Sequence, residues 1–290
     1  MESTQDIKES SLASIHDAWA TLQAHAQNGT PLEPAAYRLA FADPEFLLRP
    51  ETRGVRFQLE LLKPDLDLSA AGVHSTVVVY GSARFVSPEQ ADQQLANARA
   101  SGDATAIAAA ELARRNAVYY AQAREFARLV ATHSERQRAE DRLFICTGGG
   151  PGIMEAANRG AHDVGMPSVG LNIALPHEQH TNAYVTPYLA FKFHYFALRK
   201  MHFMMRAKAL VAFPGGFGTL DELFEVLTLV QTRKARPVPI VLFGSAYWSR
   251  LLNLDMLVEE GAISPEDLAL YRVVDTPAQA WDCIQRFYRL

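Results

Sequence analysis

The sequence contains little cysteine: Cys146 and Cys283 are the two in a chain of 290 residues. No Cys-x-x-Cys pattern occurs, which argues against a structural zinc site and against a disulfide scaffold. Cys146 stands in an apolar run, where we expect a buried thiol of the core. The nine histidines are scattered without metal-ligand spacing, so we expect no metal site.

Long apolar runs and an excess of one charge are also lacking. No run approaches the ~20 apolar residues that a membrane span needs, and residues 1–11 are polar and acidic rather than signal-like. The net charge is −4, with acidic and basic residues interleaved, which is not the basic surface of a nucleic-acid-binding protein. We therefore expect a cytoplasmic protein that binds neither membrane nor nucleic acid.

Two common nucleotide-binding patterns are missing as well. The glycine-rich segment 148–152 lacks the Lys-Ser/Thr that completes a P-loop, which argues against a nucleoside triphosphatase. The same segment does not fit Gly-x-Gly-x-x-Gly, so the dinucleotide fingerprint is absent. A nucleotide site in this chain must be built differently.

What the sequence does contain is a series of apolar, strand-like runs separated by helical patterns. These runs are Thr76–Tyr80, Leu143–Cys146, Ser168–Ile173, Ala209–Phe213 and Pro239–Phe243. Continuously apolar strands that alternate with helices are typical of a parallel sheet covered on both faces. The pattern predicts an α/β protein with a Rossmann-like, doubly wound parallel sheet, which binds ligands beyond the carboxyl ends of its strands.

The first part of the chain has a different pattern. Residues 1–72 are punctuated by prolines and begin with apolar residues at helical spacing, which predicts a helical N-terminal extension. The Rossmann-like domain is then expected over residues 73–290. Within it, the polar, alanine-rich segment Ser87–Asn116 predicts an exposed helical excursion before a helix around Tyr119–Ala131.

Three glycine-bearing loops follow three of the predicted strands. They are Gly81-Ser82-Ala83-Arg84, Gly148-Gly149-Gly150-Pro151-Gly152 with Met154 behind it, and Pro214-Gly215-Gly216-Phe217-Gly218-Thr219. Loops at the carboxyl ends of parallel strands converge at one edge of the sheet, where glycines let backbone N–H groups approach an anion. The loops therefore predict a phosphate site. An ordinary turn for the first loop and tight backbone packing for the second are the alternatives.

The third loop carries two carboxylates, Asp221 and Glu222. Thr219-Leu220-Asp221-Glu222 also reads as a capping box at a helix start, so a purely structural role for Glu222 stays open. Arg199 and Lys200 lie upstream in a helical segment, and Arg199 read alone is equally consistent with a solvated surface arginine. The methionines of that segment, Met201, Met204 and Met205, are expected to pack in the core.

Together these residues resemble the Lonely guy (LOG) family of cytokinin riboside monophosphate phosphoribohydrolases, many of which were once labelled lysine decarboxylases. The family pattern Pro-Gly-Gly-x-Gly-Thr-x-x-Glu is matched without a gap by Pro214 to Glu222, and Arg199-Lys200 precede it at the family's spacing. The segment from Gly148 to Ala161 looks like the longer bacterial subgroup. The resemblance covers roughly Thr76 to the C-terminus.

The resemblance implies hydrolysis of the N-glycosidic bond of an adenine-type nucleoside 5′-monophosphate, without a cofactor, by a dimer or larger homo-oligomer. It implies that Arg199 and Glu222 are catalytic. The residues expected to bind substrate or phosphate are Gly81, Ser82, Gly148, Gly149, Gly150, Met154, Lys200, Gly215, Gly216, Gly218, Thr219 and Asp221. A non-catalytic nucleotide or molybdenum-cofactor carrier of similar fold is the alternative function. The extra segments, 1–72 and Ser87–Asn116, leave base preference and assembly open.

Overall fold

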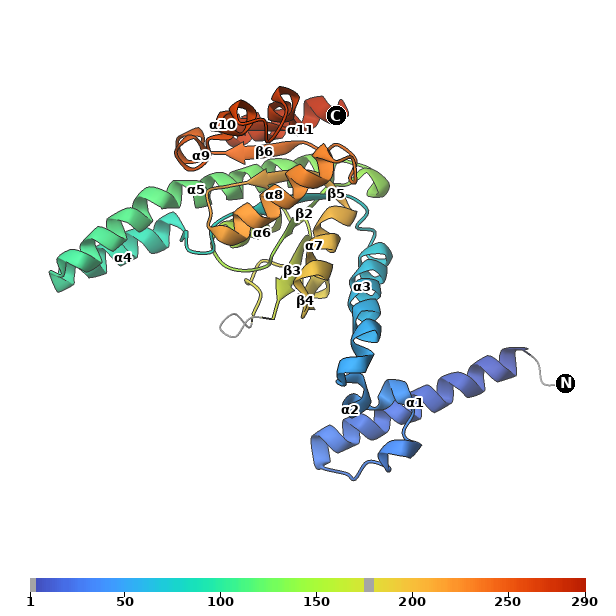
Figure 1. Ribbon diagram of the computed structural model, residues 1–290. Coiled ribbons are helices and arrows are strands. Elements are labelled where there is room, and N and C mark those ends of the chain that lie inside the picture. Colours follow the sequence, from blue (N-terminus) through green and yellow to red (C-terminus); the bar gives the residue numbers. More distant parts are fainter. Residues whose placement is uncertain (1–3, 175–179) are drawn as a thin grey trace. The chain divides into compact units, whose positions relative to one another are not determined.

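The computed structural model describes residues 4–174 and 180–290 (Figure 1). By internal contacts the chain divides into two compact units, Met1–Leu59 and Glu60–Leu290. The predicted domain boundary after residue 72 lies inside the second unit, because Leu68 is buried in the core of that unit. The division into a helical extension, 1–72, and a Rossmann-like domain, 73–290, stays a prediction. Within the described ranges, no helix combines the length and apolarity needed to cross a membrane.

The first unit is helical, as the sequence predicts. It consists of α1 (Thr4–Asn28), the short helix α2 (Pro44–Leu47), the 3-10 helices Ala35–Tyr37, Ala40–Ala42 and Pro50–Thr52, and the start of α3 (Arg53–Ala70). The carboxylate of Asp43 caps α2 by accepting hydrogen bonds from the backbone N–H groups of Glu45 and Phe46. Pro44 and Pro50 stand at the starts of α2 and of the 3-10 helix Pro50–Thr52, whereas Pro64 lies inside α3.

The second unit is built on a seven-stranded sheet in the order β4-β3-β2-β1-β5-β6-β7, and every pair is parallel. The strands are β1 (Thr76–Tyr80), β2 (Phe144–Thr147), β3 (Ser168–Ile173), β4 (Ala190–Phe193), β5 (Ala207–Ala212), β6 (Ile240–Phe243) and β7 (Tyr271–Val274). The five predicted strands are confirmed. The edge strands β4 and β7 were missed, because each leaves residues exposed and so carries no continuous apolar run.

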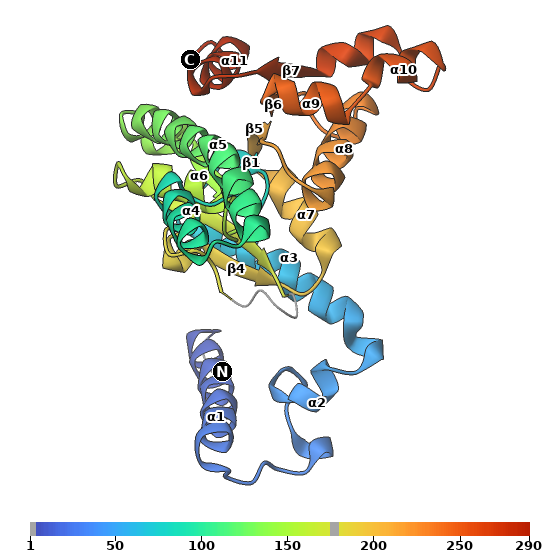
Figure 2. The same cartoon turned by 90° about the vertical axis from the view of Figure 1, so that its left-hand side faces the viewer.

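Helices cover both faces of this sheet. Helices α5 (Ala104–Glu135), α6 (Ile153–His162) and α11 (Pro277–Tyr288) lie on one face, and α7 (Phe196–Met205), α8 (Phe217–Gln231) and α9 (Ser245–Leu251) lie on the other (Figure 2). A further helix, α10 (Leu254–Glu259), and 3-10 helices at Ala139–Asp141, Pro187–Leu189 and Pro265–Leu270 complete the unit. The predicted doubly wound α/β architecture is confirmed.

The segment Ser87–Asn116 is helical, but it does not end before the next helix. Helix α4 (Pro88–Ser101) begins with a capping box between Ser87 and Gln90, and a turn at Gly102 leads into α5. Helix α5 then continues without a break through the predicted helix at 119–131 (Figure 1). The outer half of α5, which packs on α4, is thus continuous with the half that packs on the sheet.

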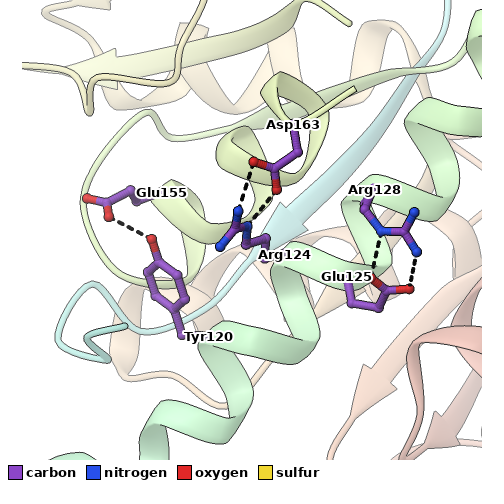
Figure 3. Close-up of polar contacts among 6 residues, drawn as sticks. All are labelled: Tyr120, Arg124, Glu125, Arg128, Glu155 and Asp163. Atoms are coloured by element: carbon purple, nitrogen blue, oxygen red, sulfur yellow. Dashed lines mark hydrogen bonds and ion pairs between the residues drawn. The ribbon is translucent and has the colours of Figure 1, made fainter. Parts of the chain in front are cut away.

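Polar contacts hold α5 against α6 (Figure 3). The Tyr120 hydroxyl donates to Glu155 Oε1 at 2.7 Å, and Arg124 donates two hydrogen bonds to the carboxylate of Asp163, at 2.6 and 2.9 Å. The two helices approach closely at Gly160, where a Cβ would lie 2.1 Å from the carbonyl oxygen of Arg124. The contact of Glu155 lies in the first turn of α6, and those of Gly160 and Asp163 lie at its end, so the helix is held against α5 along its whole length.

The core contains the predicted thiol but not all of the predicted methionines. Cys146 is 2% exposed, and burial raises the pKa of its thiol to about 12, so it is an inert core residue. Met204 packs against the core. Met201 and Met205 are 48% and 47% exposed, which contradicts the prediction, because they lie on the outer side of α7.

Candidate active site

A cavity of about 1180 Å³ opens beyond the carboxyl ends of β1 and β5. These strands are neighbours, yet the chain leaves β1 toward β2 on one side and β5 toward β6 on the other. Such a reversal separates the loops that follow the two strands and creates a crevice, the usual ligand site of doubly wound sheets. The cavity is lined by the loop after β1, one side of α5, the first turns of α8, and α9.

Ser82 joins the three glycine loops through its backbone. Its N–H donates to the carbonyl oxygen of Pro214 at 2.9 Å, and its carbonyl oxygen accepts from Ile153 N at 3.0 Å. A Cβ at Gly152 would lie 2.3 Å from the Ser82 oxygen, so a glycine is needed for this approach. Gly81 is equally confined, since its Cβ would lie 2.6 Å from Ile153. The predicted convergence of the loops is confirmed.

Helix α8 does not begin with a capping box. Its N-cap is Gly216, which offers no side-chain acceptor, and the helix starts at Phe217 rather than after Thr219. The N–H groups of Thr219 and Leu220 donate to the Gly216 carbonyl oxygen. Glu222 therefore lies in the second turn of the helix, where it caps nothing, and its side chain lines the cavity.

The first turn of α8, called the cradle below, is open and has N–H groups that could bind an anion. No hydrogen bond to the backbone N–H of Phe217 or Gly218 occurs within residues 4–174 and 180–290, and a Cβ at Gly216 or Gly218 would meet no heavy atom within 4 Å. Gly215, in contrast, could not carry a Cβ without approaching Thr219 Oγ1 to 2.1 Å. N–H groups and the positive end of the helix dipole thus face a space large enough for a phosphate.

Arg199 and Glu222 meet at the inner wall of the cavity. Nη1 of Arg199 lies 3.9 Å from Oε1 of Glu222, and their side chains are 14% and 9% exposed. The Arg199 side chain is held by a hydrogen bond from Nε to the Leu171 carbonyl oxygen, at 2.7 Å, and by the ring of Phe203, whose centroid is 5.1 Å from the guanidinium carbon. The surface-arginine interpretation is therefore wrong.

Glu222 has an unusual proton affinity for a carboxylate. Burial raises its pKa to about 7, although the positive charges of Lys200 and Arg199 act in the opposite direction. A carboxyl group with a pKa near neutrality exists in both protonation states at physiological pH. It can therefore exchange protons with a bound molecule, which is the property of a general acid or base.

Lys200 points away from Arg199 despite being its neighbour in sequence. Its Nζ lies 2.8 Å from Asp221 Oδ2 and 2.9 Å from Glu225 Oε2, and Lys200 does not line the cavity as the structure describes it. Asp221 does line the cavity, with its side chain 60% exposed. The predicted contact of Lys200 with substrate stays a prediction, whereas its observed role is to neutralise carboxylates of α8.

The glycines of the second loop, 148–150, are buried, and Gly149 and Gly150 are hydrogen-bonded within the protein. Gly149 N donates to Thr147 Oγ1 at 2.9 Å, and the side chain and backbone of Asn182 donate to the carbonyl oxygens of Gly150 and Gly149. This bonding matches the packing alternative for the loop. Met154 is the residue from this segment that lines the described cavity, and substrate binding by the glycines stays a prediction.

Several lining residues were missed in the sequence. Arg115 and Tyr119 come from α5, and Tyr247 and Arg250 come from α9. Tyr247 supports the cradle, since its hydroxyl donates to the Gly215 carbonyl oxygen at 2.6 Å. These residues stand in ordinary amphipathic helices, and no local pattern distinguishes a side chain that faces a cavity from one that faces solvent. Among the described residues, no group of three or more His, Cys, Asp or Glu is placed to hold a metal ion.

Comparison with solved structures gives weak likenesses. One is the molybdenum cofactor binding protein from the phototrophic bacterium Rippkaea orientalis, at 16% identity and a TM-score of 0.46, over 74% of this chain and 97% of that one. Another is the Moco carrier protein from Chlamydomonas reinhardtii, at 18% identity and the same TM-score, over 74% and 99%. Likenesses of this degree carry no functional argument.

Curated proteins give a more informative comparison. A probable cytokinin riboside 5′-monophosphate phosphoribohydrolase of Oryza sativa subsp. japonica is 33% identical over 47% of this chain and 56% of its own length. A cytokinin riboside 5′-monophosphate phosphoribohydrolase of Arabidopsis thaliana is 33% identical over 42% and 57%. The chain thus spans about half the length of these relatives. A family model described as possible lysine decarboxylase matches residues 154–284.

Proposed function

We propose that this protein hydrolyses the N-glycosidic bond of nucleoside 5′-monophosphates with an adenine-type base, AMP and cytokinin nucleotides included, and releases free base and ribose 5-phosphate. The observation that carries the proposal is the placement of the buried Glu222, with its pKa of about 7, in the same cavity as the uncapped first turn of α8. The names of the curated relatives support the same reaction class.

The cradle at α8 receives the 5′-phosphate in this proposal. Free N–H groups at Phe217 and Gly218 and the open space at Gly216 suit phosphate oxygens, and the helix dipole favours their negative charge. A phosphate held there places the attached ribose deeper in the cavity. The sugar then lies toward Arg199 and Glu222.

Glu222 acts on the sugar. Cleavage of the bond between C1′ and the base nitrogen builds positive charge on the ribose, as in the hydrolysis of O-glycosides. The ionised carboxylate stabilises that charge or accepts a proton from the attacking water. Arg199, 3.9 Å away, keeps part of the Glu222 population ionised and presents a fixed positive charge to the phosphate or to the departing base.

Aromatic and apolar side chains of the cavity lining suit the base. Phe85 and Tyr119 stack with ring centroids 6.0 Å apart, and Val118 and Leu251 add apolar surface to the same cavity. Flat apolar walls of this kind accept a heterocycle. The cavity volume of about 1180 Å³ exceeds the usual range of about 300–1,000 Å³, which leaves room for a substituent on the base.

We also propose that the protein is at least a homodimer. Phe217 is 92% exposed and Phe196 is 52% exposed, and both line the cavity. Met201, on the same helix as Phe196, is 48% exposed. Apolar side chains grouped on α7 and α8 are typical of a surface that another subunit covers. A cytoplasmic location stays a prediction from the composition.

The test is direct. Purified full-length chain is incubated with AMP and, separately, with isopentenyladenosine monophosphate, and free base is measured by chromatography. The Glu222→Gln variant is expected to lose turnover and to keep its affinity for ribose 5-phosphate. Release of no base from any nucleoside monophosphate, together with tight binding of the intact nucleotide, would overturn the hydrolase in favour of a non-catalytic carrier.

A further inference from the structure

Tyr80, the last residue of β1, presents a buried hydroxyl without an internal partner. The residue is 6% exposed and lines the cavity, yet its Oη forms no hydrogen bond within residues 4–174 and 180–290. Buried hydroxyl groups nearly always have a partner, because leaving one unpaired costs the folded state free energy. An unpaired hydroxyl that lies directly beneath the lining of a cavity therefore points to a partner that reaches it when a ligand binds.

The Tyr80 ring is held in position by packing against a side chain that also contacts Arg199. The ring meets Phe203 edge to face, with centroids 5.0 Å apart and an interplanar angle of 77°. Phe203 also carries the guanidinium of Arg199 over its ring. The backbone is fixed as well, since the Tyr80 carbonyl oxygen accepts from Phe213 N at 2.8 Å. The hydroxyl is thus held in place by groups that also position the active-site pair.

The surroundings keep this hydroxyl protonated. Burial raises the pKa of Tyr80 well above its ordinary value, and the negative charge of Glu222 raises it further. Arg199 opposes this effect without cancelling it. The group is therefore a neutral O–H, able to donate one hydrogen bond and to accept others, and it is unsuited to act as a base.

We propose that the Tyr80 hydroxyl binds a ribose hydroxyl of the substrate while the 5′-phosphate occupies the first turn of α8. This proposal rests on the proposed function and identifies a sugar-binding group for it. Three positions would contact the substrate here: the first turn of α8 at the phosphate, Glu222 one turn further along α8, and Tyr80 at the end of β1, the strand that pairs with β5. A ribose held at two points presents its anomeric carbon to the carboxylate in one orientation.

Calorimetric titration of the full chain with two probes tests the proposal. Tyr80→Phe keeps the ring and its contact with Phe203 and removes only the hydroxyl. We expect its affinity for ribose 5-phosphate to be about 10-fold weaker than that of the wild type, with its affinity for inorganic phosphate unchanged. Tyr288→Phe is the matched control: it removes a hydroxyl that donates to the Lys208 carbonyl oxygen outside the cavity lining, and neither affinity should change.

Three results would overturn the proposal: unchanged affinity of Tyr80→Phe for ribose 5-phosphate, equal weakening for both probes, or no binding of ribose 5-phosphate by the wild type. The second result would indicate a disturbed cradle instead of a lost sugar contact. Failure of the hydrolase function is a separate outcome. It would show as a wild type that releases no base from AMP while Tyr80→Phe still loses its affinity for ribose 5-phosphate.

Discussion

The space left by the missing side chain of Gly148 holds the guanidinium of Arg199. A Cβ built at Gly148 would lie 2.6 Å from Nη2 of Arg199 and 2.8 Å from Sδ of Met154. The first glycine after β2 therefore acts on the site through Arg199, whose guanidinium lies beside Glu222. The glycine-rich loop thus helps to position an arginine that is far from it in the sequence.

Gly148→Ala is accordingly expected to push Arg199 away from Glu222. Base release from AMP should fall by about 10-fold or more, since fixed charges near the reacting sugar lose their position. The free energy of unfolding should fall by about 1–3 kcal/mol, as is usual for overpacked sites. Gly54→Ala is the control, because a Cβ there meets nothing within 4 Å. Full activity in Gly148→Ala would contradict the proposed dependence on Arg199.

Glu222→Gln is expected to stabilise the protein in a pH-dependent way. The folded-state pKa of Glu222 is about 7, above its ordinary value of 4.5, so the folded protein loses stability as the pH rises between these values. Above pH 7 the buried carboxylate costs the folded state on the order of 3 kcal/mol. Glutamine removes this cost, so the gain in the free energy of unfolding should be larger at pH 8 than at pH 5, measured by urea denaturation.

Asp267→Asn provides the control for that measurement. A hydrogen bond from Gln231 is the main cause that lowers the pKa of Asp267, so its carboxylate is already ionised in the folded protein at pH 5. Loss of this carboxylate should therefore lower stability slightly at both pH values. An equal gain for Glu222→Gln at pH 5 and pH 8 would show that Glu222 is not destabilised by ionisation.

Gly216→Ala separates phosphate binding from folding. The methyl group meets no heavy atom within 4 Å in the free protein, so the melting temperature should stay within about 2 °C of the wild type. The same methyl group occupies space that the phosphate needs, and affinity for inorganic phosphate should fall by about 10-fold or more. Gly215→Ala makes the contrast, since its Cβ would lie 2.1 Å from Thr219 Oγ1 and should lower stability as well. Unchanged phosphate affinity in Gly216→Ala would place the anion elsewhere.

Phe217→Glu is expected to weaken self-association. A charge at this 92% exposed position would be costly to bury in an apolar interface, so sedimentation velocity should show more monomer than for the wild type at equal concentration. Tyr188→Glu is a suitable control, as Tyr188 is 67% exposed but does not line the described cavity. A wild type that sediments as a monomer at all concentrations would contradict the proposed dimer.

Most of the fold could be predicted, since buried parallel strands require apolar runs, and five such runs became β1, β2, β3, β5 and β6. The edge strands β4 and β7 were missed because only part of each is buried. The excursion and the helix near Tyr119 were predicted as two elements and are both helical, but α5 joins the second half of the excursion to that helix. Local patterns identify an element well and its partners poorly.

The candidate site divides in the same way. By itself the sequence determined the glycine loops and their convergence at one sheet edge, because these depend on backbone freedom and on the geometry of parallel strands. The pairing of Arg199 with Glu222 was expected only from the resemblance to a known family. Only the tertiary structure decided that α8 starts at Phe217, that Lys200 turns to Asp221, and that the second loop is bonded internally. It also decided the burial that raises the Glu222 pKa and leaves the Tyr80 hydroxyl unpaired. Burial and side-chain direction arise from contacts between distant segments, which no local pattern contains.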